Sequence, residues 1–385
     1  MKILISDYSG HPFPFELSQI LSKKYNVIHN YAQYFETPKA NFKTKNISPK
    51  LKIKPTKIKS RFVKDNFISR RSNDILYGKT LIQLITEQKP NIVICCQLPL
   101  DPLYEVISYC KSNQIKTVFW MQDIYSEAIG RILNKKFPFF GKLIGKYYFY
   151  KEKKCEYMSD KIIVISSDFK RFIDKKNLKK TTIIENWSPA IKSNIKKIQY
   201  FKKKYNPQKK FCFIYSGTLG YKHNPELFFK IAENFPKAIL IISSEGKFAN
   251  ELKKISNEKL PKINVIKWLD YKDLSSFLSI ADAFIVTLGS DASTFSVPSK
   301  IYAYLTVGKP ILGSMPLENL GAKKIKKLKT GYVSRAGVVK LFIKNCRKIV
   351  ESKRLRRKLS SNSKNYMKTR KHSLTKVIKI INQFY

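Results

Sequence analysis

Short apolar runs alternate with helix-forming stretches along most of the chain, and this alternation begins twice. Such an alternation predicts parallel sheets with helices on their faces, because parallel neighbouring strands need helical crossovers. The expected strands are Lys2–Ser6, Asn91–Cys96, Lys116–Met121, Lys161–Ser166 and Thr181–Asn186, then Lys210–Ser216, Ala238–Ser243, Ile263–Trp268, Ala283–Leu288 and Gly331–Ser334. The expected helices are Phe15–Lys24, Asp101–Asn113, Ser126–Leu133 and Asp168–Lys175, then Pro225–Asn234, Ala249–Asn257, Lys272–Ala281, Ser299–Thr306 and one from Val338.

The two series predict an α/β protein with two Rossmann-like, doubly wound parallel-sheet domains that face a cleft. We place the domains at residues 1–187 and 188–360, followed by a C-terminal helix, 361–385, that crosses back to the first domain. The lysine-rich stretch Ser188–Lys210 is expected to be the linker, with a short helix. The basic stretch Thr37–Lys64 is expected to be an exposed loop. Ligands of such sheets bind beyond the carboxyl ends of the strands.

The formal net charge of the 385-residue chain is +48, with only 27 acidic residues. A field this positive favours a polyanionic partner: a nucleic acid, an anionic membrane surface or a phosphorylated substrate. The six cysteines make no C-x-x-C pair, which argues against a zinc site or a disulfide framework. Several of them lie in apolar strand-like runs, which predicts buried thiols and a reducing, cytoplasmic setting. We find neither a signal peptide nor an apolar run of transmembrane length.

The stretch Tyr215–Glu226, "YSGTLGYKHNPE", joins an expected strand to an expected helix. Gly217 and Gly220 allow the backbone to turn tightly and approach a ligand, and the helix start offers free N–H groups to a phosphate. Lys222 and His223 add positive charge there. A plain tight turn explains these glycines equally well.

A second stretch of this kind, "FSVPSKIYAYLTVGKPILG", runs from Phe295 to Gly313. Pro298 fits a turn, and Ser299 fits the N-cap of a helix that ends before Gly308. Lys300 then lies at the positive end of the helix dipole, which disfavours a cation unless an anion is near. The alternative is a lysine that simply reaches solvent.

These stretches resemble the C-terminal domain of the family 4 glycosyltransferases, which are retaining enzymes of the GT-B fold. The similarity is closest to bacterial members that assemble surface polysaccharides such as capsule and lipopolysaccharide. It is carried by "YSGTLGYKHNPEL", "VPSKIYAYLTVGKPIL" and "PLENLGA", in order and spacing, and by "MQDIYSEAIG", "DKIIVISSDF" and "IIENWSP". It covers most of the chain.

One departure from the family pattern concerns two glutamates. The positions where the family carries them hold Phe295 and Ala303, so its contacts to the sugar and ribose hydroxyls of the donor are absent there. Asp291 and Glu318 lie near enough in sequence to replace them, and we favour Glu318, in the loop before Asn319. The alternative is that Glu318 only caps the following helix.

The resemblance implies transfer of a hexosyl or N-acetylhexosaminyl group from a nucleotide-diphosphate donor, with retention, to a saccharide acceptor that is expected to be lipid-linked. The chemistry mainly requires stabilisation of the diphosphate that leaves. Lys222 and Lys300 are the expected cations, since Thr218 stands where the family often has a basic residue. The expected donor-binding residues are Gly217, Thr218, Gly220, His223, Asp291, Pro298, Ser299, Glu318 and Asn319. No Asp-x-Asp motif is present, and neither a metal nor another cofactor is expected.

The acceptor is expected to bind the first domain. Gly10 and His11 follow its first strand, and His11 is a candidate contact to acceptor or donor. Asp123 follows a strand end and is the candidate for steering or deprotonating the acceptor hydroxyl. A helix N-cap is the alternative role for Asp123.

The segment Asn134–Lys154, "NKKFPFFGKLIGKYYFYKEKK", interleaves aromatic residues with lysines. It predicts peripheral binding to the inner face of the cell membrane, with rings in the lipid interface and lysines over acidic headgroups. The expected lipid contacts are Phe137, Phe139, Phe140, Leu143, Ile144, Tyr147 and Tyr148, with Lys135, Lys136, Lys142 and Lys146. The alternative is a helix packed on its own domain.

Two other functions stay open. A sugar-nucleotide epimerase of the same fold needs no acceptor, and a basic nucleic-acid-binding protein would also account for the charge. Against nucleic acid, the sequence contains no zinc, RNA-binding or helix-turn-helix signature that we recognise. A relative with weakened catalysis is a further possibility, given Phe295 and Ala303.

Overall fold

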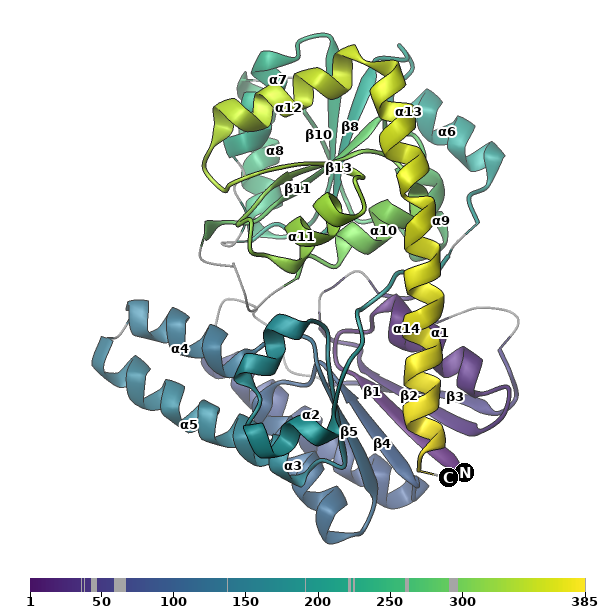
Figure 1. Ribbon diagram of the computed structural model, residues 1–385, viewed down its shortest axis with the longest axis vertical. Helices are drawn as coiled ribbons and strands as arrows, with labels where there is room; N and C mark the ends of the chain where they lie inside the picture. Colours follow the sequence, from purple (N-terminus) through teal and green to yellow (C-terminus); the bar gives the residue numbers. More distant parts are fainter. Residues whose placement is uncertain are drawn as a thin grey trace. The chain divides into compact units, whose positions relative to one another are not determined.

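A computed structural model of the chain describes residues 1–35, 37, 39–42, 47–58, 67–136, 138–190, 192–220, 223, 226–259, 263–290 and 297–384. The chain divides into two compact units, which are described separately. Unit 1 comprises Met1–Asn186 together with Ser373–Tyr385, and unit 2 comprises Trp187–His372. Each unit has its own sheet with helices around it (Figure 1).

Unit 1 is built on a seven-stranded parallel sheet with the strand order β3-β2-β1-β4-β5-β6-β7. The strands are β1 (Lys2–Asp7), β2 (Asn26–Ala32), β3 (Leu51–Thr56), β4 (Ile92–Cys96), β5 (Lys116–Met121), β6 (Lys161–Val164) and β7 (Thr181–Ile183). Strand β4 is buried along its whole length, which is why it reads as a continuous apolar run. The predicted strands of this half are confirmed to within two residues at their ends, except that the strand predicted over Thr181–Asn186 ends three residues earlier, at Ile183.

The predicted loop over Thr37–Lys64 is wrong in part, because β3 lies within it. Strand β3 pairs in parallel with β2 at the edge of the sheet, from Val27 opposite Leu51 to Ala32 opposite Thr56. Its sequence, "LKIKPT", alternates apolar residues with exposed lysines, and its proline is tolerated because an edge strand leaves one side unpaired. Strand β2 was also not predicted.

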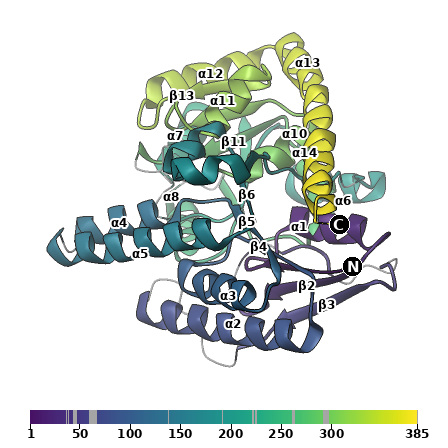
Figure 2. The same ribbon diagram turned by 60° about the horizontal axis from the view of Figure 1, so that its bottom comes forward.

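The helices of unit 1 differ more from expectation than its strands do. They are α1 (Pro12–Leu21), α2 (Phe67–Gln88), α3 (Leu100–Ser112), α4 (Tyr125–Lys136) and α5 (Pro138–Met158), with 3-10 turns at Ser167–Phe172 and Lys175–Lys180. Helix α1 begins three residues earlier than predicted, because Pro12 suits a first turn. Helix α2, which was not predicted, lies beside α3 (Figure 2). The predicted helix over Asp168–Lys175 is a 3-10 turn instead.

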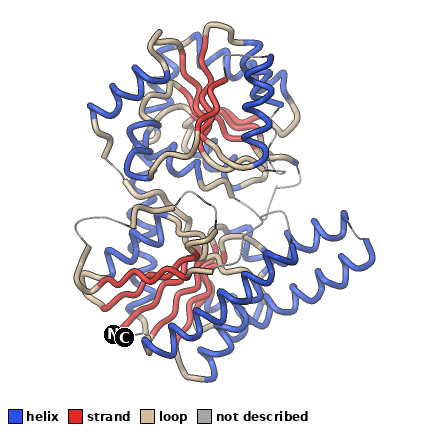
Figure 3. The backbone as a smooth tube through the Cα atoms, turned by 180° about the vertical axis from the view of Figure 1, so that it is seen from behind, coloured by secondary structure: helices blue, strands red, loops and turns tan. Residues whose placement is uncertain are grey.

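Helices α4 and α5 form a hairpin that extends away from the sheet of unit 1 (Figures 1 and 3). Glycines let the two backbones approach: a Cβ built on Gly145 would lie 3.1 Å from the Gly130 Cα. The predicted lipid contact Tyr148 is wrong, because this side chain is buried and its hydroxyl donates a 2.8 Å hydrogen bond to the Asp101 carboxylate on α3. Phe137 and the side chains of Lys135, Lys136 and Phe139 lie outside the described residues.

A buried carboxyl group lies between these two helices. The Glu152 side chain on α5 is buried and accepts a hydrogen bond from the Ser126 hydroxyl on α4. Burial, with the Glu156 carboxylate nearby, raises the pKa of Glu152 to about 7 from its ordinary 4.5. Between these values the folded chain keeps a proton that the unfolded chain releases, so this group makes the fold less stable as pH rises.

Replacing Glu152 by glutamine should therefore stabilise unit 1 at pH 8 by up to about 3 kcal/mol, and should change little at pH 4. Glutamine keeps the shape of the side chain but carries no charge. Urea unfolding at both pH values measures the effect, with Glu105→Gln on the exposed side of α3 as the control. Equal free energies of unfolding for the variant and the native chain at pH 8 would contradict the raised pKa.

All six cysteines are buried and unpaired, which was predicted for the several that lie in apolar runs. Burial raises the pKa of each thiol, so the thiolate form is disfavoured. No described helix has both the length and the apolar character that a bilayer-spanning segment requires.

Unit 2 contains a six-stranded parallel sheet with the order β10-β9-β8-β11-β12-β13. Its strands are β8 (Phe211–Ser216), β9 (Ala238–Ser243), β10 (Ile263–Ile266), β11 (Ala283–Thr287), β12 (Ile311–Ser314) and β13 (Gly331–Ser334). All the strands predicted for this half are confirmed to within two residues at their ends. The strand order reverses between β8 and β11. The connections that leave these two neighbouring strands therefore lead to opposite faces of the sheet.

The helices of unit 2 are α6 (Ile195–Tyr205), α7 (Glu226–Asn234), α8 (Lys247–Lys259), α9 (Tyr271–Leu278), α10 (Lys300–Val307), α11 (Leu320–Lys327), α12 (Val339–Glu351) and α13 (Lys353–Asn362). Apolar residues of α7, α8 and α12 share one core cluster against the sheet. Helix α6, expected in the linker, packs on α9, where the rings of Phe201 and Phe277 lie 5.7 Å apart.

The last helix, α14 (Lys364–Asn382), is divided between the two units, since Ser373–Tyr385 groups with unit 1. In that part Leu374, Val377 and Ile381 are buried, at a spacing that places them on one helix face. The Tyr25 hydroxyl donates a 2.9 Å hydrogen bond to the Asn382 side chain. The predicted return of the C-terminal helix to the first unit is thus observed.

Candidate functional site

The two stretches that the sequence singles out in unit 2 meet where the strand order reverses. Gly217 directly follows β8, and Lys300 begins α10, which comes after β11. A Cβ built on Gly217 would lie 2.8 Å from the Lys300 Cε and 3.2 Å from its Nζ. The ammonium group therefore rests against the backbone of the first loop, although 83 positions separate the two residues in sequence (300 − 217).

Tyr215, the next-to-last residue of β8, holds Lys300 in this position. The Lys300 Nζ donates a hydrogen bond to the Tyr215 hydroxyl and lies 3.8 Å from the centroid of its ring. The hydroxyl in turn donates a 2.8 Å hydrogen bond to the Thr218 carbonyl. Burial raises the pKa of Tyr215 well above its ordinary value, which keeps the phenol neutral. Sequence reasoning did not identify Tyr215.

A second tyrosine fastens α10 to the end of β8. The Tyr304 hydroxyl accepts a 2.8 Å hydrogen bond from the Ser216 N–H, and its ring stacks on Phe284 of β11 at 4.0 Å. This contact fixes the distance between α10 and the glycine loop, Gly217–Gly220, that follows β8. Helix α10 ends at Gly308 in the left-handed conformation (φ 78°), as the sequence predicts.

The predicted role of Ser299 as a side-chain cap is wrong. Ser299 occupies the residue before α10, but its backbone is already helical and its side chain caps no N–H group. The N–H of Ile301 donates to the Pro298 carbonyl instead, at 3.1 Å. Pro298 is buried and Ser299 is exposed, so the Ser299 hydroxyl faces solvent next to Lys300.

The glycine loop also folds onto itself through His223. The Gly220 N–H donates a 3.0 Å hydrogen bond to the His223 Nδ1, and the His223 N–H donates to the Gly220 carbonyl at 2.9 Å. Gly217 has φ 135°, a conformation that favours glycine. The predicted residues Lys222, Asp291 and Phe295 lie outside the described residues.

A third loop, between β12 and α11, reaches the beginning of α10. The Asn319 Oδ1 caps α11 by accepting a 2.8 Å hydrogen bond from the Gly321 N–H. A Cβ on Gly321 would lie 2.5 Å from the Ile301 Cδ1 and 3.2 Å from the Pro298 Cγ, so the two helix starts pack closely. Glu318 is exposed and does not cap the helix, which excludes the structural role considered for it.

Ala303 lies on α10, where a family glutamate was expected, and is partly buried. Its side chain is a methyl group, which cannot accept a hydrogen bond from a sugar hydroxyl. Of the two carboxylates considered as replacements, Glu318 is exposed directly before the N-cap of α11, and Asp291 lies outside the described residues.

In unit 1 the strand order reverses between β1 and β4, and here a buried aspartate accompanies the predicted residues. Gly10 adopts φ 73°, and the N–H of His11 donates a hydrogen bond to the Asp7 carboxylate. The other Asp7 oxygen lies 3.6 Å from the His11 Nδ1, and neither of these two buried atoms has a hydrogen-bond partner among the described residues. Asp7, at the end of β1, was not identified from the sequence.

Asp123 lies after β5, beside the loop that follows β4. Its carboxylate accepts a 3.1 Å hydrogen bond from the Gln97 side chain, and the Tyr125 hydroxyl donates to the Gln97 carbonyl at 3.3 Å. Gln97 itself has φ 53°, a conformation that non-glycine residues seldom adopt. Burial, with the Asp123 carboxylate nearby, raises the pKa of Tyr125 above its ordinary range. The two loops at this edge of the sheet thus converge on Asp123.

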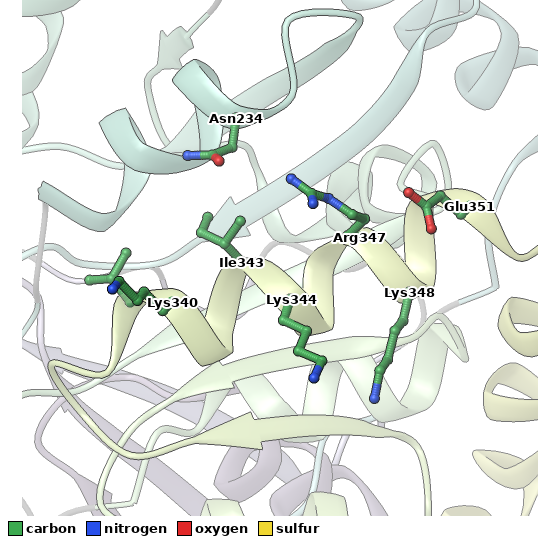
Figure 4. A pocket seen from close by; sticks show the side chains of 8 residues that line it. Asn234, Lys340, Ile343, Lys344, Arg347, Lys348 and Glu351 are labelled. Carbon is green, nitrogen blue, oxygen red and sulfur yellow. The ribbon is translucent and has the colours of Figure 1, made fainter.

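A hollow of about 610 Å³ lies elsewhere in unit 2, between α7 and α12. Figure 4 shows Ile343 and Arg347 of α12 beside Asn234 of α7, with Lys344 and Lys348 further round the helix. The charged side chains of α12 here are exposed. The hollow does not include any of the residues at the carboxyl ends of the strands.

Comparisons with known proteins match part of the chain to a family model and the whole chain to solved structures. Residues 196–366 match the family model described as glycosyl transferases group 1. None of the curated proteins matches the sequence.

Solved structures match the whole chain. Alr3699/HepE of Anabaena in complex with UDP-glucose is 14% identical, with a TM-score of 0.71 over 100% of both chains. The same protein in complex with UDP is 13% identical, with a TM-score of 0.69 over 100% of both chains. Sucrose-phosphate synthase from Thermosynechococcus elongatus is 10% identical, with a TM-score of 0.71 over 100% of this chain and 98% of that one. At such identities the likeness shows the fold, which is GT-B, as the sequence predicts.

Proposed function

We propose that the chain transfers a sugar, a hexosyl or N-acetylhexosaminyl group, from a nucleoside diphosphate donor to a saccharide acceptor, with retention at the anomeric carbon. The observation that carries the proposal is the Lys300 ammonium, held by Tyr215 against Gly217 at the point of unit 2 where the strand order reverses. That point lies within the residues that match the glycosyl transferase model. The solved neighbour Alr3699/HepE holds UDP or UDP-glucose, which supports a uridine donor.

In the proposed reaction the bond between the anomeric carbon and the diphosphate breaks, and negative charge grows on the diphosphate as it leaves. Lys300, with Lys222, neutralises this charge, and the backbone of Gly217, Thr218 and Gly220 approaches the phosphates closely. His223 and Ser299 add hydrogen-bonding groups. No metal or other cofactor is required in this scheme.

The other donor-binding residues are proposed from their places in the loops around the start of α10. Pro298 and Asn319 shape the start of α10, where Asn319 acts by holding the α11 loop. Glu318 binds the ribose hydroxyls, with Asp291 as the other carboxylate available.

Replacing Glu318 by glutamine should weaken donor binding by roughly tenfold, because a carboxylate accepts hydrogen bonds from a diol more strongly than an amide does. The fold should not change, since Glu318 is exposed and no hydrogen bond or ion pair joins its side chain to the described residues. Calorimetric titration with UDP-glucose measures the affinity, and Glu351→Gln on α12 is the matched control. An unchanged affinity would remove Glu318 from the site.

On the acceptor side, we propose that Asp123 steers or deprotonates the attacking hydroxyl, and that Gly10 and His11 contact the acceptor. The acceptor is a lipid-linked saccharide in the assembly of a cell-surface polysaccharide, such as capsule or lipopolysaccharide. The chain would then act in the cytoplasm, as a peripheral protein on the inner face of the membrane.

Thermal unfolding with UDP, GDP, ADP, TDP and CDP, and then with their sugars, tests the proposed donor. A hundredfold excess over Kd adds about 2.7 kcal/mol to the stability of the bound unit, which is a rise of roughly 5 to 10 °C in Tm. Uridine compounds are expected to give this rise. If no nucleotide shifts Tm, the enzymatic proposal fails, and if the sugar of the donor changes without an acceptor, the epimerase is the better interpretation.

A further inference from the structure

Helix α5 of unit 1 exposes an apolar stripe along one of its sides. Half of the large apolar side chains that are exposed in the described part of the chain lie on this one helix. Phe140, Leu143, Tyr147 and Tyr150 are 67%, 54%, 46% and 58% exposed. Their spacing of three, four and three residues places them along one side of the helix.

The stripe is not the face that α5 uses for its own packing. Gly141, Tyr148, Glu152 and Cys155 are buried and lie on a different side of the helix, which faces α4 and α3. Helix α5 therefore has two apolar faces, one of which is already occupied by unit 1. The hairpin extends away from the sheet of unit 1 (Figure 3), and the four side chains of the second face are exposed.

Lysines border the stripe. Lys142 and Lys146 are exposed beside it, and the Lys154 Nζ lies 5.2 Å from the centroid of the Tyr150 ring. Such side chains lay their aliphatic stems along an apolar surface and present the charge at its edge. Apolar rings with cations at their border match the interface of an anionic bilayer, where rings enter the acyl region and ammonium groups meet headgroups.

We infer that the stripe on α5, formed by Phe140, Leu143, Tyr147 and Tyr150 with Lys142 and Lys146, binds the surface of an anionic lipid membrane, with the helix lying in the plane of the interface. A second copy of the chain does not fit, because two chains that each carry +48 repel one another. A nucleic acid fits less well, because the aliphatic Leu143 and the neighbouring Ile144 offer nothing to phosphates or bases. The inference rests on the proposed function only in that the proposed acceptor is lipid-linked.

Binding of the full chain to vesicles tests the inference. Vesicles of phosphatidylcholine alone and vesicles that also contain phosphatidylglycerol are compared by flotation at low and high salt. Binding is expected only with phosphatidylglycerol, and should fall as salt increases. Equal binding to both kinds of vesicle would overturn the inference.

Two double variants separate the parts of the surface. Phe140→Ser with Tyr147→Ser should weaken vesicle binding at least tenfold, through the apolar area no longer buried in lipid. Lys142→Gln with Lys146→Gln should weaken it roughly 25-fold, since each lysine near an anionic surface contributes about a fivefold factor. All four side chains are exposed, so Tm should be unchanged.

Helix α6 of unit 2 supplies matched controls, because it also combines exposed apolar residues with lysines. Ile195→Ser with Tyr200→Ser removes side chains that are 73% and 55% exposed, and Lys202→Gln with Lys203→Gln removes the same charge as the α5 pair. These controls should bind vesicles as the native chain does. If they weaken binding as much as the α5 variants, total charge rather than the stripe is responsible and the inference is wrong.

Two further measurements on the same variants identify the cause of a failure. The α5 apolar variant should bind a single-stranded RNA oligonucleotide as tightly as the native chain does; if it loses the oligonucleotide as well, a nucleic acid is the better partner. UDP binding should also be unchanged. A chain that binds vesicles but none of the tested nucleotides would refute the proposed sugar transfer and leave the stripe standing. One that binds a nucleotide but no vesicles would refute the stripe and the proposed peripheral location, and leave the transfer reaction standing.

Discussion

Replacing Lys300 by glutamine should lower kcat for sugar transfer by about 100- to 1000-fold, which is the usual cost of removing one preorganised group that stabilises a developing negative charge. Tyr215 holds the ammonium in place before any ligand arrives, so little reorganisation is needed during the reaction. Glutamine retains hydrogen-bonding capacity but loses the charge. The rate is measured as release of the nucleoside diphosphate from the donor found by thermal unfolding.

The control for this variant is Lys340→Gln, which removes one exposed charge from α12. It should leave kcat unchanged, because a general reduction of the positive field is small in a chain with 75 lysines and arginines. The fold of the Lys300 variant is checked by its Tm. A kcat within a factor of three of the native value, with donor binding intact, would exclude Lys300 from the stabilisation of the leaving group.

Replacing Gly217 by alanine should impair both stability and transfer. Alanine at φ 135° carries backbone strain of about 1 to 3 kcal/mol, and its Cβ would lie 2.8 Å from the Lys300 Cε, so the lysine must move. Because Lys300 is then displaced from the loop, we expect transfer to fall by at least tenfold as well. Urea unfolding and the rate of nucleotide release measure the two effects.

Gly246 offers a matched control for the strain alone. It precedes α8, has φ 99°, and a Cβ built on it meets no atom within 4 Å. Gly246→Ala should therefore lose a similar amount of stability while transfer proceeds at the native rate. If Gly217→Ala also transferred sugar at the native rate, the contact between the glycine loop and Lys300 would have no catalytic role.

Most of the strands were predictable because a strand buried on both faces must be apolar throughout, as "IVICC" and "FCFIYS" are. The edge strand β3 was missed because its lysines suggest a loop, although "LKIKPT" does alternate as a half-exposed strand should. Helix α2 was missed because its polar and apolar residues follow no strong period. In each case the local sequence gives only a weak signal for its secondary structure, and packing against neighbouring elements determines the conformation.

The candidate site shows a different limit. Gly217, Pro298, Lys300 and Gly308 were predictable, because a turn, a helix start and a left-handed helix end each leave a local signal. Tyr215 and Tyr304 were not, since one reads as a strand residue and the other as a helix residue. Their function depends on contacts across 85 and 88 positions, which no local pattern encodes. Asp7 was missed for the same reason, because its burial beside His11 follows from the sheet.

The division of α14 between the units has a consequence for how the chain is made. Met1–Asn186 is synthesised before unit 2, yet the residues from Ser373 on, which complete the packing of unit 1, are synthesised only after unit 2. Until then the surface that buries Leu374, Val377 and Ile381 is open to water. Unit 1 therefore has an uncovered apolar surface while unit 2 is being synthesised. During this period chaperones and proteases can reach that surface. Nascent chains stalled before residue 373 should be more sensitive to proteolysis within unit 1 than the finished protein.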